Sequence, residues 1–229
     1  MIEDLQNGFK IIQDKRYFKF GTDAVLLSRF AKVKKGEKVL DLCAGSGIVP
    51  LLLKAKQETC KITGIEIIPK IADMAQRSMA LNGVDIDIVC MDLKQITENT
   101  FGVFDVVTCN PPYLQAGSGF ENDTYFETIA RSEVKCTIDD VAGAMARCLK
   151  FGGRYYLIHR ADRLCDVIAA LKKHGLEPKQ IQLIYGGPDK EAKLVLIGGT
   201  RGANSGVRIL LPQIVNGAST AEMIRDNDQ

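Results

Sequence analysis

The chain has 229 residues, of which 46% are hydrophobic and 25% charged, a globular composition that excludes disordered and collagen-like chains. Its 30 basic and 28 acidic residues give a net charge of +2, so bulk attraction cannot hold a polyanion and any contact with nucleic acid must be local. The longest apolar runs, such as residues 48–53, are far shorter than the roughly 20 residues that a membrane span requires. We therefore expect a soluble protein that folds as a single domain over residues 1–229.

The seven cysteines are scattered and never form a C-x-x-C pair, which excludes zinc-ribbon spacing and a thioredoxin motif. Most of them lie in apolar runs, where a free cysteine behaves as a small hydrophobic residue. An odd number of such thiols without a signal peptide is typical of the reducing cytoplasm. The sequence therefore predicts a cytoplasmic protein with no metal site.

From residue 38 onward, apolar runs that are typical of strands alternate with amphipathic helical segments, which indicates βαβ units and a parallel sheet. Asn82-Gly83 is a typical helix end, and Thr137 followed by two aspartates is a typical helix start. The predicted strands are Lys38–Leu42, Ile62–Glu66, Ile86–Met91, Phe104–Cys109, Arg154–Ile158, Lys179–Tyr185 and Leu194–Ile197, and the predicted helices are Ile48–Lys56, Pro69–Asn82, Ile138–Leu149 and Ala161–Lys173. The fold class that this pattern predicts is α/β.

One long segment, Leu114–Glu127, breaks the alternation, because glycines and polar residues leave about a dozen positions without periodicity. Long segments of this kind in compact domains are usually functional or disordered. We expect this loop to be mobile in the free protein and to order over a bound substrate.

A glycine-rich turn joins the first predicted strand to the next helix, with Asp41, Gly45 and Gly47 in a D-x-x-x-G-x-G pattern. Backbone N–H groups in such a turn can face a ligand at close range. A nicotinamide dinucleotide would require G-x-G-x-x-G/A, but Pro50 occupies the third glycine position. The turn instead suits a cofactor that lacks pyrophosphate and has a cationic sulfonium and an amino-acid tail. Asp41 can accept a hydrogen bond from the amino group of that tail. The alternative is a tight connection with no ligand.

Two more acids follow the next strands of the predicted sheet. Glu66 closes the second strand, where a carboxylate can accept hydrogen bonds from both ribose hydroxyls. Asp92 follows the third strand, where it can accept a hydrogen bond from an adenine amino group. Ligands of open α/β folds bind at the carboxyl ends of the strands. The three acids together favour a binding site, although each alone fits a solvated strand end.

The tetrad Asn110-Pro111-Pro112-Tyr113 follows the fourth strand. Its two prolines fix the backbone and remove two donors, so the Asn110 side chain and the Pro111 carbonyl can converge on one amino group. Methyl transfer to an exocyclic amine requires this arrangement, because accepting both hydrogens frees the nitrogen lone pair for attack. Tyr113 can stack on a planar substrate. The alternative is a rigid Pro-Pro turn with a packed tyrosine.

The order of glycine turn, Glu66, Asp92 and tetrad resembles the class I S-adenosylmethionine-dependent methyltransferases that modify amino groups. Within that superfamily, the chain is similar to the bacterial tRNA1(Val) adenine-N(6) methyltransferases over nearly its whole length. The segments that carry this resemblance are residues 8–13, 20–27, 130–133, 158–160 and 198–202.

The resemblance implies a Rossmann-like sheet of seven mostly parallel strands, ordered 3-2-1-4-5-7-6, with the seventh antiparallel. It implies S-adenosylmethionine as cofactor and, as substrate, a tRNA adenosine just 3′ of the anticodon. It places residues 1–36, and in particular Thr22 and Asp23, over the cofactor, where the alternative is a plain helix N-cap. It also places Leu93 beside Asp92 among the cofactor-binding residues.

Other residues stay open between a structural and a functional role. Residues 1–40 contain nine Lys or Arg against five Asp or Glu, which fits either a solvated face or contact with RNA phosphates. Arg131 and Glu133 can pair with each other or meet RNA, and His159 fits a strand-end histidine better than a catalyst, since the mechanism needs no base.

Three other functions compete with tRNA adenine methylation. Protein glutamine-N(5) methyltransferases share the tetrad but have a larger N-terminal helical region than the segment before Lys38 provides. Guanine-N(2) methylation of ribosomal RNA is a second rival, and a nucleotide-binding module without catalysis is a third. The sequence does not choose an oligomeric state.

Overall fold

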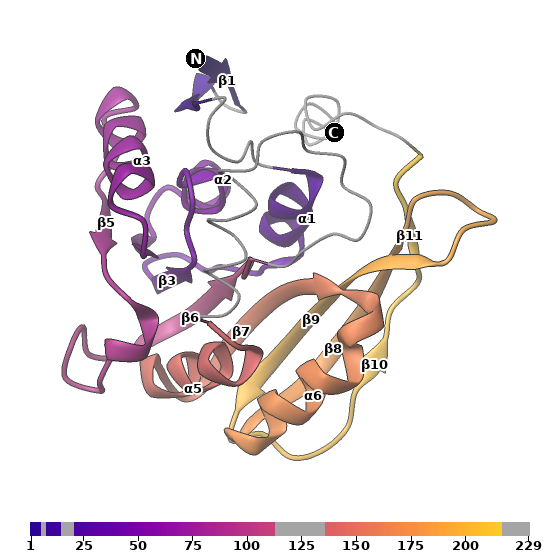
Figure 1. Ribbon diagram of the computed structural model, residues 1–229. Helices are drawn as coiled ribbons and strands as arrows, with labels where there is room; N and C mark the ends of the chain where they lie inside the picture. Colours follow the sequence, from indigo (N-terminus) through magenta and orange to yellow (C-terminus); the bar gives the residue numbers. More distant parts are fainter. Residues whose placement is uncertain (6–7, 15–20, 113–135, 217–229) are drawn as a thin grey trace.

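The computed structural model describes residues 1–5, 8–14, 21–112 and 136–216, and Figure 1 shows their arrangement. Its strands are β1 (Ile2–Asp4), β2 (Lys10–Ile12), β3 (Lys38–Leu42), β4 (Lys61–Glu66), β5 (Ile86–Cys90), β6 (Phe104–Cys109), β7 (Leu149–Arg160), β8 (Leu176–Tyr185), β9 (Ala192–Arg201), β10 (Arg208–Ile209) and β11 (Gln213–Ile214). Its helices are α1 (Thr22–Phe30), α2 (Ile48–Lys56), α3 (Pro69–Leu81), α5 (Ile138–Cys148) and α6 (Leu164–Lys173), with short 3-10 turns η2 (Leu93–Gln95) and η3 (Ala161–Arg163).

The central sheet has the order β10-β8-β9-β7-β6-β3-β4-β5. Its seven main strands therefore follow the predicted order 3-2-1-4-5-7-6, and β9 runs antiparallel to both of its neighbours, as predicted. Two short strands were not predicted: β10 and β11 each pair in parallel with β8 and extend that edge of the sheet. The α/β fold class and the mostly parallel sheet are confirmed.

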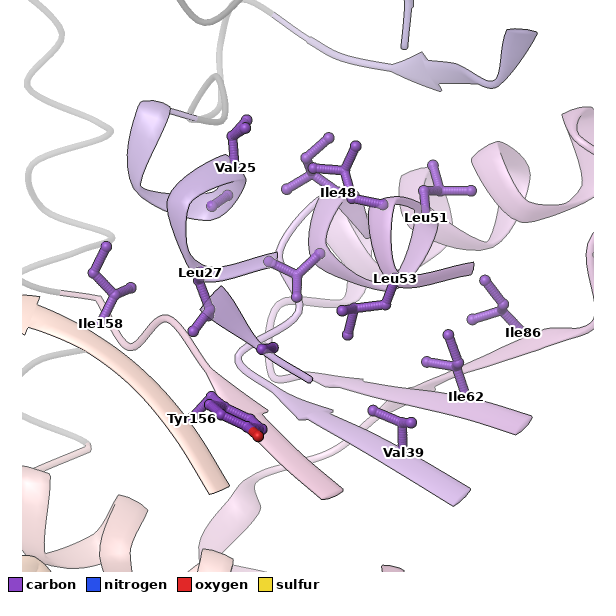
Figure 2. Packing of buried hydrophobic residues seen from close by; sticks show 14 of the residues in the cluster. Val25, Leu27, Val39, Ile48, Leu51, Leu53, Ile62, Ile86, Tyr156 and Ile158 are labelled. Carbon is purple, nitrogen blue, oxygen red and sulfur yellow. The ribbon is translucent and has the colours of Figure 1, made fainter. Parts of the chain in front are cut away.

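Strand β3 shows why the sheet is covered on both faces. Alternate side chains of a strand point to opposite faces, and those of Val39 and Leu40 are both fully buried, in two different apolar clusters. The cluster on the face of Val39 is completed by α1, α2 and α3, as Figure 2 shows for Leu27, Leu51 and Leu53. The other cluster is completed by α5 and α6. This double burial fixes the position of each residue of β3 within the sheet.

Most predicted boundaries agree with the structure to within one residue, and the exceptions are at β7, β8, β9 and the start of α6. The α5 helix begins with a capping box, in which the Asp140 N–H donates to Thr137 Oγ1 at 3.2 Å and Asp140 Oδ2 accepts from the Thr137 N–H at 2.8 Å. It ends at Cys148, and β7 begins at once, so this strand is seven residues longer than the predicted Arg154–Ile158. The predicted helix Ala161–Lys173 is divided into η3 and α6.

The N-terminal hairpin of β1 and β2 was not predicted. It packs on α3, where the Ile12 N–H donates to Ser78 Oγ at 3.0 Å and the Lys10 backbone exchanges two hydrogen bonds with the Asn82 side chain. Strands of three residues give too short an alternation to detect in a sequence. Within the described ranges, no helix is long and apolar enough to cross a membrane.

Candidate functional site

The parallel strands β3, β4, β5, β6 and β7 all end on the same side of the sheet, which we call the carboxyl edge; the opposite side is the amino edge. The glycine turn that follows β3 lies at the carboxyl edge. Gly45 and Gly47 have φ angles of +55° and +86°, in the left-handed region that favours glycine. A Cβ atom on Gly45 would meet nothing within 4 Å, so there is open space beside the turn. A Cβ atom on Gly47 would lie 2.4 Å from the Met79 side chain, so α3 packs directly against the turn.

Glu66, at the end of β4, holds this turn in place. Its Oε2 accepts the Gly45 N–H at 2.9 Å, and its Oε1 accepts the Ile68 N–H at 2.9 Å. Burial raises the pKa of this carboxyl group, and the backbone N–H donors partly oppose the rise. Each carboxylate oxygen has a second lone pair, so Glu66 can still accept ribose hydroxyls while it holds the turn. Its role in ribose binding stays a prediction.

Asp41 lies inside β3 with only 1% of its surface exposed. Its Oδ1 accepts a hydrogen bond from Thr108 Oγ1 of the neighbouring strand β6 at 2.5 Å. Burial raises the pKa of Asp41 to about 7, helped by the charge of Glu66 and opposed by the Thr108 hydroxyl. The structure therefore brings Asp41 and Glu66 close enough to repel each other, at the edge where the sequence predicted them.

Asp92 follows β5 at the same edge and is half-buried. Its Oδ1 accepts the Lys94 N–H at 2.9 Å and so caps η2, and Lys94 Nζ lies 3.7 Å from its Oδ2. The next residue, Leu93, buries its side chain in the cluster under α5, so only its backbone can face a ligand. The acids at residues 41, 66 and 92 thus belong to the adjacent strands β3, β4 and β5, as predicted.

The Asn-Pro-Pro segment begins where β6 ends. Leu42 of β3 is paired with Cys109 of β6, so Asn110 follows directly at the carboxyl edge, next to the glycine turn. Pro111 is buried, whereas Asn110 and Pro112 are half-buried. Tyr113 lies outside the described residues, as do Arg131, Glu133 and the loop Leu114–Glu127. The structure thus places the first three residues of the tetrad beside the turn and its acids.

Helix α1 brings Thr22 and Asp23 to the same edge. Lys56, in the last turn of α2, donates to the carbonyls of Arg29 and Ala31 at 3.0 and 2.8 Å, so α1 and α2 end side by side. Because α2 begins at the glycine turn, the first turn of α1 also lies toward the carboxyl edge. The N-cap is Gly21, so Thr22 is the first helical residue rather than the cap. That Thr22 and Asp23 cover a cofactor stays a prediction.

Three cysteines from different elements meet at this site, which sequence reasoning treated only as separate apolar residues. Cys43 of the turn contacts both Cys109, which precedes Asn110, and Cys136, which precedes α5. The hydrogen bond with Cys109 raises the pKa of Cys43, and the hydrogen bond with Cys43 together with burial raises that of Cys136. Burial raises the pKa of Cys109, although its hydrogen bond with Cys43 opposes the rise, so these thiols stay protonated. No group of three or more His, Cys, Asp or Glu side chains in the described parts of the chain is arranged to hold a metal ion.

The basic residues near the N-terminus that the structure describes lie far from this site. Lys34 and Lys35 are exposed in the connection that leads to the start of β3, at the amino edge, and Lys10 lies at the end of α3 on that same side. Their contact with phosphates stays a prediction. His159 lies near the end of β7, where burial lowers the pKa of its ring and keeps it neutral at neutral pH.

A family model described as the methyltransferase small domain matches residues 16–136, which is more than half of the chain. The chain belongs to this family. The matched region contains the glycine turn, the three acids and the Asn-Pro-Pro-Tyr tetrad.

Several similar proteins have the name tRNA1(Val) (adenine(37)-N6)-methyltransferase. One, from Phocaeicola vulgatus, is 28% identical over 191 residues, which cover 82% of this chain and 80% of that protein. Another, from Mannheimia succiniciproducens, is 32% identical over 66% of this chain and 62% of its own length. The match to a relative from Haemophilus influenzae is 34% identical but spans only about half of either chain.

Solved structures of methyltransferases share the fold. A predicted O-methyltransferase from Agrobacterium tumefaciens is 22% identical, with a TM-score of 0.69 over 86% of this chain and 89% of the other. A methyltransferase from Pyrococcus furiosus has a TM-score of 0.65 at 17% identity, over 86% of this chain and 91% of the other. The predicted Rossmann-like methyltransferase fold is thus confirmed, and the chain is a methyltransferase of this fold.

Proposed function

We propose that this protein transfers a methyl group from S-adenosylmethionine to the N6 amino group of an adenine in tRNA. One observation carries the proposal: the buried acids of a cationic-cofactor site and the Asn-Pro-Pro segment of an amine site adjoin each other, at the ends of the neighbouring strands β3 and β6. Such a site holds donor and acceptor side by side, which is the main requirement for methyl transfer.

The residues present fit S-adenosylmethionine. The space beside Gly45 is open, and the buried carboxyl groups Asp41 and Glu66 favour a ligand with positive charge and no phosphate. When bound, this cofactor supplies an electrophilic methyl group on a sulfonium. Asp41 would accept a hydrogen bond from its amino group. Glu66 would accept hydrogen bonds from its ribose hydroxyls, and Asp92 would accept one from its adenine amino group.

The tetrad would act on the target amine. The Asn110 side-chain carbonyl and the Pro111 carbonyl accept its two hydrogens, which draws the nitrogen toward tetrahedral geometry and frees its lone pair. The amine proton becomes acidic only as the new N–C bond forms, so no strong base is needed. Tyr113 would hold the flipped base by stacking on its plane.

The names of the similar proteins support adenine of tRNA as the substrate. The family model also fits other amino methyltransferases, so protein glutamine and ribosomal guanine remain the rival substrates. A nucleotide-binding module without catalysis would not explain why the acids and the Asn-Pro-Pro segment lie side by side.

The test incubates the purified protein with S-adenosylmethionine and tRNA from cells that lack the gene, followed by mass spectrometry of the nucleosides. We expect one N6-methyladenosine per acceptor tRNA, and the same nucleoside should be missing from the tRNA of those cells before incubation. Formation of N2-methylguanosine in ribosomal RNA, or of methylglutamine in a protein, would replace the proposal with a rival. Cofactor binding without transfer to any amine would reduce the protein to a binding module.

A further inference from the structure

A buried polar pair links the cofactor side of the site to its amine side. Asp41 of β3 and Thr108 of β6 face each other across the parallel pair, and both are inaccessible to solvent or nearly so. The 2.5 Å between Thr108 Oγ1 and Asp41 Oδ1 is the separation of a hydroxyl bound to an ionised carboxylate. On its other side Asp41 is paired with Gly64, which has no side chain and offers no hydrogen bond in place of the hydroxyl.

The surroundings of Asp41 work against its negative charge. Burial raises the pKa of Asp41 to about 7, and the neighbouring Glu66 carboxylate on β4 acts in the same direction. The Thr108 hydroxyl is the group that opposes this rise. Cys109 on β6 also interacts electrostatically with Asp41. On the helices of this face, the first turn of α1 contains the acidic Asp23, and the first turn of α2 contains no acidic residue.

We infer that Thr108 is a positioning residue for the cofactor, which favours the ionised form of Asp41 and leaves its second oxygen free for the cofactor's amino group. A hydroxyl can donate only one hydrogen, and Thr108 gives it to Oδ1, so Oδ2 remains as the acceptor. The inference rests on the proposed function, because it takes Asp41 as the partner of the cofactor's ammonium group.

This arrangement makes cofactor affinity depend on pH with a defined sign. A protonated Asp41 has lost the charge that attracts an ammonium group, so binding must release the proton wherever Asp41 holds one. With half-protonation near pH 7, the affinity contributed by Asp41 should rise about tenfold between pH 6 and pH 8 and then level off.

The test compares Thr108→Val, which keeps the shape but not the hydroxyl, with Thr108→Ser, which keeps the hydroxyl. The dissociation constant of S-adenosylmethionine is measured by calorimetry from pH 6 to 9, and each variant is compared with the wild type at the same pH, which cancels titration of the ligand. If Asp41 binds its proton about ten times more tightly in Thr108→Val, the affinity of this variant for S-adenosylmethionine should be about fivefold below that of the wild type at pH 7. The two affinities should become equal by pH 9. Thr108→Ser should follow the wild type throughout.

A second measurement does not depend on the ligand. The carboxyl carbon signal of Asp41 in the free protein, followed by NMR, should titrate at higher pH in Thr108→Val than in the wild type. An affinity loss that is the same at every pH, or an unmoved Asp41 titration in the folded variant, would overturn the inference and leave Thr108 a packing residue. A wild-type protein that binds no S-adenosylmethionine would instead overturn the proposed function, while the NMR titration would still decide what the hydroxyl does to Asp41.

Discussion

Replacing Gly47 by alanine should cost free energy of unfolding in two ways, one from the backbone conformation of the turn and one from packing against Met79. A non-glycine residue in the left-handed region costs about 1–2 kcal/mol, and Gly47 has a φ of +86°. The added Cβ would also lie 2.4 Å from the Met79 Cε atom, and overpacking of this kind typically costs about 1–3 kcal/mol. Because that atom is the flexible end of a side chain, we expect the lower part of the range. Gly47→Ala should then lower the free energy of unfolding by about 2–4 kcal/mol.

A matched control is available at Gly83, which has a φ of +61° and nothing within 4 Å of an added Cβ. Gly83→Ala should therefore show the backbone cost alone, about 1–2 kcal/mol. Urea unfolding of both variants, each in the wild-type and the Met79→Ala background, separates the two parts. In the Met79→Ala background, the cost of Gly47→Ala should fall to that of Gly83→Ala. A cost of Gly47→Ala that equals that of Gly83→Ala in the wild type, or that is unchanged without Met79, would refute the reasoning.

Three other predictions concern the proposed site and its partner. Asn110→Ala should lower single-turnover methyl transfer by about 10²–10³ with little change in cofactor affinity, because the side chain acts on the amine in the transition state; wild-type turnover would contradict its catalytic role. Glu66→Ala should weaken S-adenosylmethionine binding by about 1–3 kcal/mol in a calorimetric titration, and an equal affinity would remove the ribose assignment. Reversing both Lys34 and Lys35 to Glu should weaken tRNA binding and flatten the salt dependence of its affinity by roughly one unit per lost contact, whereas an unchanged slope would leave them as solvated residues of the amino edge.

The parts of the site that the sequence revealed are those set by local pattern. A strand that ends in an acid and a glycine turn specifies its own geometry, and the parallel topology then brings the ends of β3, β4, β5 and β6 to one edge. For this reason the local pattern is enough to place Asp41, Glu66, Asp92 and Asn110 at one edge of the sheet, although not on neighbouring strands. The sheet order itself came from resemblance to a family, since apolar periodicity does not determine which strands are neighbours.

The parts that could not be predicted depend on register between distant segments. Thr108 reads as one polar residue in an apolar strand, and only the pairing with Asp41, 67 residues away, shows what it contacts. The contact of Cys43 with Cys109 and Cys136 has the same origin. Charge counted along the chain likewise does not show that Lys34 and Lys35 lie at the amino edge, and their contact with RNA phosphates stays a prediction.

The burial of β3 on both faces has a consequence for how this protein can change in evolution. Val39 and Asp41 point to the face covered by α1, α2 and α3, while Leu40 and Leu42 point to the other. Apolar residues of similar volume can replace one another here, but inserting or deleting one residue would exchange the faces. Asp41 would then enter an apolar cluster without its hydroxyl partner, which costs several kcal/mol. The length of this strand is therefore under much stronger constraint than the identity of its apolar side chains.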